Sequence, residues 1–597
     1  MTARWQFWID RGGTFTDLVA RASDGRTKVH KVLSAHPSGE DAVLRGLRAL
    51  LDLPAGAPLP AEHIAGVRMG TTVATNALLE RAGTPTVFVT TAGHADVLRI
   101  GTQQRPDLFA RHIVRPEPLY RQVATVRERM GADGTVVQPL DEAQARAALE
   151  AAYADGCRAC AIALLHGYRY PAHEEQVAAL ARAVGFAQVS TSHATDPLQR
   201  LVPRGHTTVA DAYVAPVLRQ YVARVQDALG DVPLQLMQSN GGLADASQVR
   251  GKDTLLSGPA GGLVGAVRAC AEAGYDRLVS FDMGGTSTDV AHYGGTLERR
   301  DTAQVAGVPV RTPVLDIHTV AAGGGSIVQI DQGRYRVGPD SAGAQPGPAC
   351  YGQGGPLTIT DCNLQLGRLQ PDFFPSVFGP EGDAPLDATV VHDRFDALAQ
   401  DAGEDRPPEA IAEGFLAVAV EKMAQAIRTI SLERGHDIDG YTLCCFGGAG
   451  GQHACRMAEA LGLGRVLLHP YAGVLSAYGI GVADERIVRR KAVGAPLPEA
   501  TATLPDRLDA LAQQARRLLS ADGDALQVYR RVSLRYRGTD TALSVAADTA
   551  DAMRDAFAAA YRQRFGFGGP DRPLVVEAIE VEVVRPGTVP THEPLAQ

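Results

Sequence analysis

The sequence FWIDRGGTFTDLV at Phe7–Val19 is matched by SFDMGGTSTDVA at Ser280–Ala291. Both stretches contain D-x-G-G-T-x-T-D after a short apolar segment. This pattern is typical of a strand that enters a tight glycine turn and returns as a second strand. The same strand–turn–strand element at two distant places predicts a duplicated α/β fold with one site between its halves.

The two turns carry the groups that phosphate and magnesium require. We expect the paired glycines to adopt positive φ, so that backbone amides can approach and surround phosphate oxygens. Hydroxyls would donate hydrogen bonds, and carboxylates would hold magnesium through water. For either copy alone, a tight hairpin without a ligand is the alternative. The predicted residues are Asp10, Gly12, Gly13, Thr14, Thr16 and Asp17 in the first copy, and Asp282, Gly284, Gly285, Thr286, Thr288 and Asp289 in the second.

A third glycine-rich stretch, FGGAGGQHAC at Phe446–Cys455, follows an apolar strand and precedes a predicted helix. Its glycines would let a flat adenine or ribose lie against the backbone, and the helix N-terminus favours nearby anionic groups. Such turns are common, but beside the duplicated pair this one makes ATP the expected ligand. Neither D-x-G-G-T turn matches the P-loop pattern. The predicted nucleotide contacts here are Gly447, Gly448, Ala449 and Gly450.

Length and charge limit the class of protein. At 597 residues the chain is too long for one core and should form three or four domains. The net charge of −9 is spread along the chain, so neither nucleic acid nor an anionic membrane surface is an expected partner. The first residues lack a secretory apolar segment, and no apolar run reaches the length of a membrane span, about 18 residues. These features predict a soluble cytoplasmic protein.

The eight cysteines are scattered along the chain. Cys157 and Cys160 form a lone CxxC, a spacing found in metal and redox sites, but they lie in the apolar stretch CRACAIALLHGY. No second CxxC completes a zinc site, and small thiols are common in cores. We therefore predict structural cysteines in a reducing compartment, and the same holds for Cys444 and Cys445 in TLCCF.

Helical and strand periods alternate between residues 141 and 192, which predicts an α/β region. Strands and glycine turns are expected from 234 to 360, a loop at 371–387 and a linker at 496–500. The predicted helices cover 73–81, 141–156, 173–185, 207–229, 411–435 with a C-cap at Gly435, and 504–519. The predicted strands cover 1–10, 66–72, 87–91, 157–166, 186–192, 532–538 and 576–584.

Further stretches complete a pattern that resembles the hydantoinase A/5-oxoprolinase family, in the superfamily of acetate kinase, sugar kinases, Hsp70 and actin. They include MGTTVATNALLERAG, SGPAGGLVGA, PVLDIHTVAAGGGSI, GPDSAGAQPGPACYG and YAGVLSAYGIGVAD, and LRYRGTDTALSV and RFGFGGP extend the match nearly to the end. The resemblance implies an actin-like, two-lobed α/β fold with a small C-terminal α+β region. The expected domains are residues 1–200, 201–495 and 496–597.

The resemblance also implies a reaction. By it, Asp10–Thr16 match the first phosphate loop, Asp282–Thr288 the second, and Gly447–Gly451 the adenosine loop, with ATP and magnesium as cofactors. RWQFWIDRGGTFTD, LVPRGHTTVADAY, GGQHAC and RYRGTDTAL resemble the 5-oxoprolinase branch. The implied activity is phosphorylation of the lactam carbonyl of 5-oxoproline for ring opening to glutamate.

Other activities stay open: action on hydantoin or another lactam, ATP-dependent carboxylation of a ketone, or a non-catalytic nucleotide-switched binding protein. The family also implies a B-type subunit that hydrolyses the activated ring. Because the chain ends after the A-type region, we expect this partner to be a separate polypeptide in a hetero-oligomer.

Asp10, Arg11 and Asp282 are the expected catalytic residues. Arg11 stands where other family members have glycine, and a cation beside the phosphates would stabilise charge on the transferred group. In the alternative, Arg11 packs and pairs with a surface carboxylate.

Four further residues are candidates for the lactam. Asn76 would face the cleft near a helix N-terminus, or cap a turn. Arg105 would present its fork to a carboxylate, or form an ordinary surface ion pair. Asp316 and His318 would bind or polarise the substrate, or form a buried hydrogen-bonded pair. The sequence assigns no chemistry to His453, Asp340, Cys350 and Asp361.

Overall fold

The computed structural model describes residues 4–34, 39–103, 108–374, 376–403, 405–433, 437–519, 526–569 and 572–587. The chain forms two compact units. The first comprises Met1–Ala260, Arg299–Leu315 and Ile480–Gln597, and the second comprises Gly261–Glu298 and Asp316–Gly479. These limits differ from the expected boundaries near residues 200 and 495, and the division into three domains stays a prediction.

A ten-stranded sheet runs through the first unit in the order β26-β25-β27-β24-β12-β11-β4-β1-β2-β3. β1 is antiparallel to β2 and parallel to β4, so the first glycine turn lies beside the end of β4. The strands are β1 (Trp5–Arg11), β2 (Phe15–Ala22), β3 (Thr27–Leu33), β4 (Ile64–Thr71), β11 (Leu234–Met237), β12 (Leu243–Asp245), β24 (Glu485–Pro496), β25 (Gln527–Tyr536), β26 (Leu543–Ala546) and β27 (Leu574–Arg585).

Two helices, α1 (Ala42–Leu50) and α7 (Leu201–Leu229), share an apolar core with one face of β1 and β4. Phe7 and Ile9 of β1 are fully buried in this core. The predicted helix at 207–229 is confirmed, but it begins six residues earlier, at Leu201. Pro203 stands in the first turn of this helix. Proline is tolerated there, because N–H groups in the first turn have no intrahelical partner.

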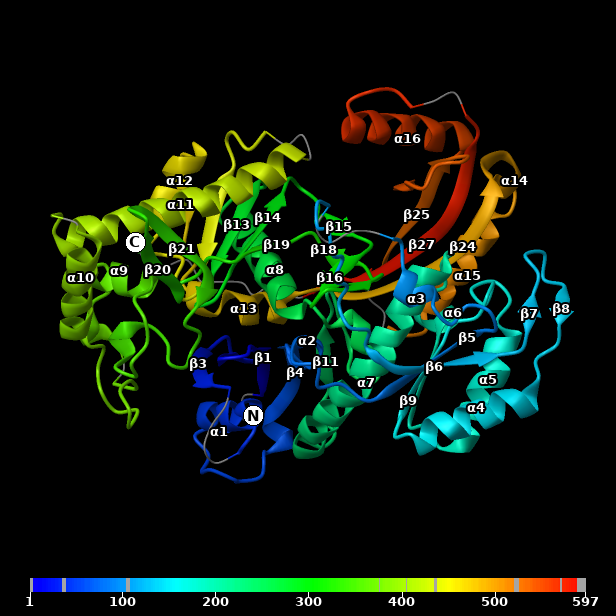
Figure 1. Ribbon diagram of the computed structural model, residues 1–597, viewed down its shortest axis with the longest axis horizontal. Coiled ribbons are helices and arrows are strands. Elements are labelled where there is room, and N and C mark those ends of the chain that lie inside the picture. Colours follow the sequence, from blue (N-terminus) through cyan, green and yellow to red (C-terminus); the bar gives the residue numbers. More distant parts are fainter. Residues whose placement is uncertain are drawn as a thin grey trace. The chain divides into compact units, whose positions relative to one another are not determined.

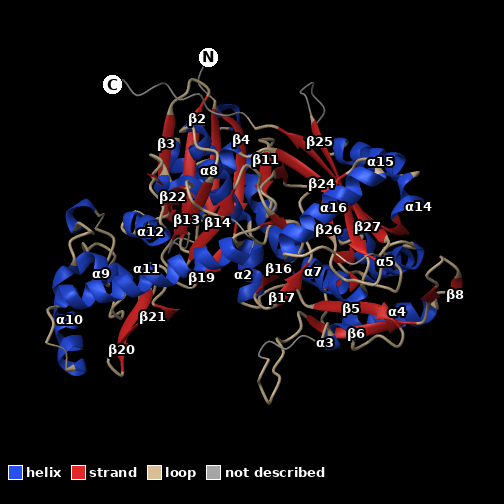
Figure 2. Ribbon diagram, turned by 90° about the horizontal axis from the view of Figure 1, so that it is seen from above, coloured by secondary structure: helices blue, strands red, loops and turns tan. Residues whose placement is uncertain are grey.

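The predicted alternation of helices and strands at 141–192 is confirmed. Its two strands, β9 and β10, belong to a parallel four-stranded sheet in the order β10-β9-β5-β6. Figure 2 shows β5 and β6 side by side, with α4 next to them. The elements are β5 (Thr86–Thr91), β6 (Tyr120–Val126), α4 (Glu142–Ala154), β9 (Ala159–Ile162), α5 (Ala172–Val184) and β10 (Gln188–Thr191). The same unit contains α2 (Val73–Leu79), α3 (Val97–Ile100), α6 (Ser192–Thr195), β7 (Arg129–Met130), β8 (Val136–Gln138), β15 (Arg299–Arg300), β16 (Ala303–Val305), β17 (Val308–Val310) and β18 (Val314–Leu315).

The linker expected at 496–500 is wrong. Strand β24 runs through Pro496, and helix α14 (Leu497–Thr501) follows directly. Leu497 and Ala500 are buried in a core that also includes α15 (Leu504–Arg516) and α16 (Ala550–Phe565), so apolar burial fixes this segment. Figure 1 shows α16 lying over β25.

The second unit is built around a five-stranded sheet in the order β19-β14-β13-β22-β23. β13 is antiparallel to β14 and parallel to β22, which places the second glycine hairpin next to the strand that leads into the glycine-rich loop at Gly447–Gly451. The elements are β13 (Leu278–Met283), β14 (Thr288–Tyr293), β19 (His318–Val320), β20 (Ser326–Asp331), β21 (Arg334–Ser341), α9 (Ile359–Gln365), α10 (Ala388–Ala402), α11 (Pro408–Glu433), β22 (Thr442–Phe446), α12 (Ala454–Leu461) and β23 (Val466–Leu467).

The long helix is confirmed as α11, whereas its expected C-cap, Gly435, lies outside the described residues. The glycine-rich stretch SGPAGGLVGA, expected to form turns, instead begins the 16-residue helix α8 (Ser257–Glu272). Its glycines make room for a neighbour: a Cβ on Gly265 would lie 2.6 Å from the carbonyl oxygen of Leu475, at the start of α13 (Leu475–Val482). Local pattern suggested turns because this close helix packing depends on residues far along the chain.

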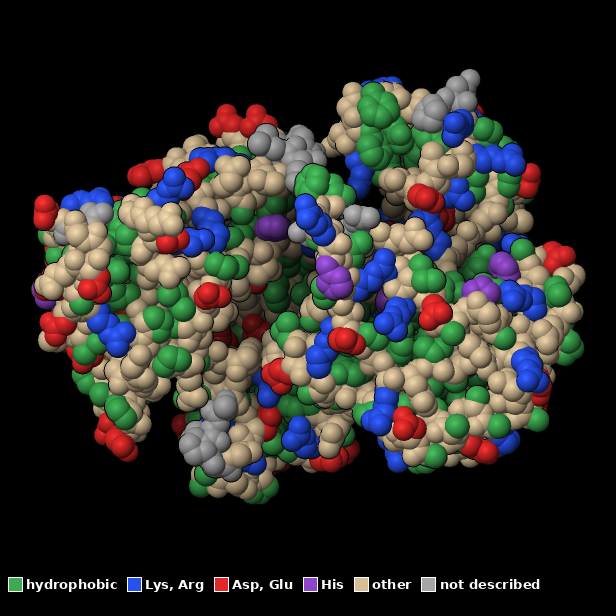
Figure 3. Space-filling view, viewed as in Figure 1, with side chains coloured by type: hydrophobic (Ala, Val, Ile, Leu, Met, Phe, Trp, Pro, Cys, Tyr) green, Lys and Arg blue, Asp and Glu red, His purple; other side chains and the backbone are tan. Residues whose placement is uncertain are grey.

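Within the described residues, no helix has the length and apolar character needed to cross a membrane. Seven of the cysteines are buried and Cys455 is exposed. The burial expected for Cys157, Cys160, Cys444 and Cys445 is confirmed. On the face shown in Figure 3, basic and acidic side chains are interspersed.

Candidate functional site

The two D-x-G-G-T-x-T-D stretches form the same hairpin, as predicted. In the first, Asp10 is opposite Asp17 in register, and the amide of Gly12 donates to the carbonyl of Phe15 at 3.0 Å. In the second, Asp282 is opposite Asp289, and the amide of Gly284 donates to the carbonyl of Ser287 at 3.0 Å. The duplication that is visible in the sequence is therefore also present in the structure.

The positive φ expected for the paired glycines is wrong, because none of the four glycines in these turns has a positive φ. Gly12 is required for a different reason: a Cβ there would lie 2.8 Å from the carbonyl oxygen of Phe15. By contrast, a Cβ on Gly13 would meet nothing within 4 Å. The tight hydrogen bond that closes the turn excludes a side chain at its first glycine.

The Asp10 carboxylate, at the start of the first turn, has unusual surroundings. Its Oδ1 is buried and accepts no hydrogen bond from the described residues. This oxygen lies 3.3 Å from the positions that a Cβ would take on Gly70 and on Gly258. Burial raises the pKa of Asp10 to about 7, with Asp17 adding to the rise and Lys31 opposing it. An oxygen held in this way suits a hard cation or the water bound to one.

Asp17 differs from Asp10 because it has a cationic partner. It forms an ion pair with Lys31 of the neighbouring strand β3. Burial still raises the pKa of Asp17, while Lys31 opposes that rise. Carboxylates with different surroundings thus stand side by side across the hairpin.

The hydroxyls of the first turn have separate environments. Thr14 is exposed at the tip of the turn. Thr16 is fully buried, with its Oγ1 at 3.0 Å from the Oγ of Ser34. Ser34 in turn donates to the carbonyl oxygen of Gly12 at 2.8 Å. Thr16 therefore braces the turn from within, and only Thr14 has the exposure that a direct phosphate contact needs.

Arg11 lies beside a tyrosine of α7. Its guanidinium carbon is 4.9 Å from the ring centroid of Tyr221, and no ion pair links it to a carboxylate among the described residues. The backbone carbonyl of Arg11 accepts from both the amide and the hydroxyl of Thr72, each at 3.2 Å. Asn76 is half-buried within α2, which begins directly after Thr72. The other lactam candidate of this unit, Arg105, lies outside the described residues.

The start of α8 is a site element that the sequence did not reveal. Ser257 exchanges hydrogen bonds with Thr71 at the end of β4: its Oγ accepts from the Thr71 amide and donates to the Thr71 carbonyl, both at 3.1 Å. This places the first turn of α8 next to Asp10, where helix amides favour anionic groups. The motif SGPAGG does not reveal this contact from sequence, because Ser257 and Thr71 lie 186 residues apart.

The second glycine turn has Thr286 exposed and Thr288 buried, as in the first copy. The hydroxyl of Thr288 donates to the carbonyl of Ala322 at 2.5 Å. Burial raises the pKa of Asp289, although Thr319 donates to its Oδ1 at 2.6 Å. The pattern of exposed first threonine and buried second threonine is therefore repeated.

The glycine run at Gly323–Gly325 packs on this turn. The amides of Gly324 and Gly325 donate to the carbonyls of Gly284 and Gly285, at 3.1 and 2.6 Å. Thr360, in the first turn of α9, donates to the Gly324 carbonyl from its amide at 2.7 Å and its hydroxyl at 2.9 Å. Hydrogen bonds from Gly324 and Gly325 therefore hold the second turn, and Thr360 in turn holds Gly324.

The expected adenosine loop connects β22 with α12, as predicted. Gly447 has φ +85°, and a Cβ there would collide with Oδ1 of Asp282 and the backbone of Met283. The amide of Ala449 donates to the Met283 carbonyl at 2.9 Å. Gly448 is exposed and open. The loop is therefore held directly against the end of the second hairpin, within one unit.

Asp316 and His318 do not form a buried pair, because His318 is exposed in β19 and Asp316 is half-buried. Asp340 is also exposed. His453 is fully buried at the start of α12, and burial lowers its pKa to about 4, which keeps it neutral.

Asp361 has a structural role that explains its place in a motif. It caps α9 by accepting from the amide and hydroxyl of Thr358, at 2.8 and 2.9 Å. It also accepts from the amides of Ala349 and Cys350, at 3.1 and 2.8 Å. This one carboxylate orders the loop in front of the helix whose Thr360 bonds Gly324.

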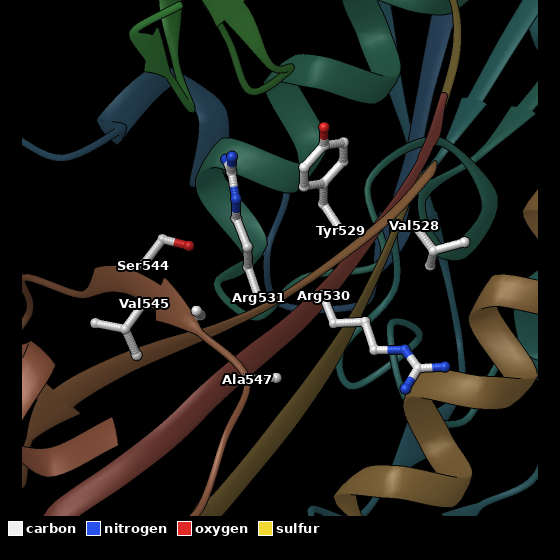
Figure 4. A pocket seen from close by; sticks show the side chains of 8 residues that line it. Val528, Tyr529, Arg530, Arg531, Ser544, Val545 and Ala547 are labelled. Atoms are coloured by element: carbon white, nitrogen blue, oxygen red, sulfur yellow. The ribbon is translucent and has the colours of Figure 1, made fainter. Parts of the chain in front are cut away.

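An open groove runs along strands β25 and β26 of the first unit (Figure 4). Tyr529 and Arg531 point to one side of the strand and Val528 and Arg530 to the other. None of the predicted site residues lines it.

Solved structures share this architecture. The ATP-dependent caprolactamase from Pseudomonas jessenii superposes with a TM-score of 0.85 at 29% identity, covering 99% of this chain and 89% of that chain. A nucleotide-free acetone carboxylase structure superposes with a TM-score of 0.75 at 24% identity, covering 99% of this chain and 88% of that one. The fold and the duplicated hairpins thus define a mixed α/β protein with the architecture of these two structures.

Sequence comparisons give the family. The family model described as "Hydantoinase/oxoprolinase" matches residues 204–489, and that described as "Hydantoinase/oxoprolinase N-terminal region" matches residues 6–185. The 5-oxoprolinase of Saccharomyces cerevisiae is 40% identical over 96% of this chain and 49% of its own length. The caprolactamase subunit alpha of Pseudomonas jessenii is 31% identical over 97% of this chain and 87% of its own length. The chain belongs to the hydantoinase/oxoprolinase family, and it spans about half the length of the 5-oxoprolinases that it matches.

Proposed function

We propose that this chain is the ATP-dependent, lactam-activating part of a 5-oxoprolinase. The observation that carries the proposal is the buried, unbonded Asp10 Oδ1 at the end of a glycine hairpin that is repeated at Asp282. The 40% identity to 5-oxoprolinases over nearly the whole chain supports the choice of substrate.

Magnesium fits the acidic ends of the two hairpins. Asp10 and Asp282 supply hard carboxylate oxygens, the donors that this ion prefers, and Asp10 offers an oxygen without a protein partner. When bound, the ion would neutralise charge on the phosphate oxygens of ATP. We assign Asp10 and Asp282 to this role, mainly through bound water.

The chain's own groups would orient the nucleotide. The exposed turn residues Gly13, Thr14, Gly285 and Thr286 are available to phosphate oxygens. We assign the adenosine to the loop Gly447–Gly450, in which Gly448 is exposed and Gly450 is buried. Phosphoryl transfer depends chiefly on such positioning and on electrostatic stabilisation. Rigid backbone around Gly284 and Gly285 would help, because it needs no rearrangement when charge moves.

The proposed reaction begins with phosphorylation of the lactam. The γ-phosphoryl group leaves ADP and bonds to the lactam carbonyl oxygen, while the ring nitrogen loses its proton, which gives an imidate phosphate. One water then adds to the ring carbon, the C–N bond breaks, and an acyl phosphate forms. A second water releases phosphate and leaves glutamate. We assign the two water-dependent steps to a B-type partner on a separate chain, a choice supported by the name "subunit alpha" of the caprolactamase relative.

The test is ATP hydrolysis by this chain with and without a co-expressed B-type partner, in the presence of 5-oxo-L-proline, while glutamate is measured. We expect glutamate and ADP in equal amounts only when both chains are present. ATP turnover that ignores 5-oxoproline but responds to caprolactam or hydantoin would reject the substrate and keep the reaction class.

A further inference from the structure

Asp10 and Arg11 are neighbours on β1, but they occupy different faces of the sheet. Side chains alternate between faces along a strand. Asp10 lies beside Gly70 and Gly258, near the start of α8. Arg11 follows the parity of Phe7 and Ile9, which belong to the core shared with α7. The Arg11 side chain therefore leads away from the Asp10 carboxylate.

Its surroundings hold Arg11 without neutralising it. Tyr221, only 2% exposed, presents its ring 4.9 Å from the guanidinium carbon, an attractive cation–π arrangement. The Nε of Arg11 is buried without a hydrogen-bond partner, and no described carboxylate forms an ion pair with this side chain. A cation that is stacked but not paired is suited to a carboxylate ligand, because guanidinium and carboxylate match as two parallel hydrogen bonds.

The backbone ties Arg11 to a second candidate for lactam binding. Thr72 donates twice to the Arg11 carbonyl and immediately precedes α2. Asn76 lies one helical turn beyond, and its amide donates to the Thr72 carbonyl at 2.8 Å. Backbone hydrogen bonds therefore connect Arg11 to the first turn of α2.

We propose that Arg11 binds the carboxylate of a cyclic amide acid, with Tyr221 as its positioning residue. Arg11 then selects lactams that carry a carboxylate and does not act on the phosphates of ATP. The inference rests on the proposed function and specifies how that same site recognises its substrate class.

The experiment compares 5-oxo-L-proline with 2-pyrrolidone, the same ring without the carboxylate, using this chain together with its B-type partner. For Arg11→Gln we expect KM for 5-oxoproline to rise about 10- to 100-fold, the range for a lost charge-assisted pair. KM for ATP and the turnover of 2-pyrrolidone should change less than about twofold. Arg224→Gln is the matched control, because Arg224 stands over the same ring at 5.8 Å but is exposed.

Tyr221 supplies a second comparison. Tyr221→Phe keeps the ring and should preserve KM for 5-oxoproline, whereas Tyr221→Leu should raise it several-fold and leave KM for ATP unchanged. A purely structural role would lower turnover of both lactams in parallel. Thermal unfolding of each variant, and Arg11→Lys as a milder change, separate misfolding from lost recognition.

The outcomes separate the two proposals. If Arg11→Gln impairs both lactams equally and raises KM for ATP, Arg11 acts at the phosphates and the inference is overturned. Calorimetry of 5-oxoproline binding does not need turnover. Binding that depends on Arg11 in a protein without ring-opening activity would support the inference while rejecting the proposed function. Binding of equal strength in the wild type and Arg11→Gln would overturn the inference alone.

Discussion

The two glycine hairpins have the same register and the same closing hydrogen bond, but different structures lie behind them. The first hairpin adjoins the start of α8, and it leaves Asp10 Oδ1 buried and unbonded. The second receives hydrogen bonds from Gly324 and Gly325 and contacts the proposed adenosine loop at Gly447. Copies of one element have thus acquired different supports, one that leaves a carboxylate oxygen available and one that fixes a backbone surface.

This difference suggests a division of tasks. In the first hairpin, the distinctive feature is a single charged group with an unsatisfied oxygen. In the second, it is a stack of backbone hydrogen bonds that includes Thr360 of α9. We expect changes of charge to be felt most in the first copy, and changes of volume most in the second.

The largest effects should come from the first carboxylate of each hairpin, Asp10 and Asp282. Asp10→Ala and Asp282→Ala should each lower ATP-dependent turnover by about 10³-fold, because each removes a group that organises charge around the transferred phosphoryl. Asp10→Ala should unfold at the same temperature as the wild type or higher, since it removes a buried carboxylate that has no hydrogen-bond partner at Oδ1. Steady-state ATPase and thermal unfolding check both statements. Near wild-type turnover in either variant would reject the assignment of that carboxylate.

Volume changes test the second copy. Gly447→Ala should impair ATP binding at least tenfold and destabilise the protein by about 1–3 kcal/mol, because a Cβ there meets Asp282 and Met283 and φ is +85°. Gly448→Ala, one residue along in open space, is the control and should change both quantities little. Nucleotide titration and urea unfolding provide the readouts. Equal effects at the two positions would mean that the contact with Asp282 does not shape the loop.

The same logic applies within the first turn, with a smaller expected effect on binding. Gly12→Ala should destabilise the protein because its Cβ would press on the Phe15 carbonyl, whereas Gly13→Ala points into open space. We expect a difference of about 1–2 kcal/mol in the free energy of unfolding, measured by urea denaturation. Gly13→Ala should still weaken ATP binding if the turn faces phosphate. Unchanged nucleotide affinity in that variant would place the phosphates elsewhere.

The hairpins, the strand before the adenosine loop and the α/β region at 141–192 were predictable, because local apolar runs and glycine turns specify them. The φ angles of Gly12 and Gly284 were not, since the turn closes through a 3.0 Å hydrogen bond with no positive φ. Helix α8 was not predictable because its glycines make room for residues far along the chain, such as Asp10 and Leu475, while helix propensity argues against glycine.

The candidate site shows the same limit. Asp10 and Asp282 were found from a repeated motif, whereas Ser257 and Thr360 reach the turns only through contacts between distant segments. For Asp316 and His318 the sequence left open a role toward the substrate or a buried pair, and the exposure of His318 excludes the buried pair, since one sequence does not reveal which side of a short strand faces solvent. Residues whose role depends on tertiary contacts therefore needed the structure.

The smallest predicted effects concern Asp17 and Asp289, the carboxylates on the second strand of each hairpin. Asp17 pairs with Lys31, whose side chain is 41% exposed, so Lys31→Met should cost less than about 1 kcal/mol and its effect should shrink in high salt. Asp289 accepts a 2.6 Å hydrogen bond from Thr319, and Thr319→Val should cost about 1–2 kcal/mol with little salt dependence. Unfolding in low and high salt distinguishes the two. A salt-dependent loss at Thr319 and a salt-independent loss at Lys31 would reverse the contrast. In that case the ion pair of Asp17 and the hydrogen bond of Asp289 would not account for how the two hairpins contribute to the free energy of unfolding.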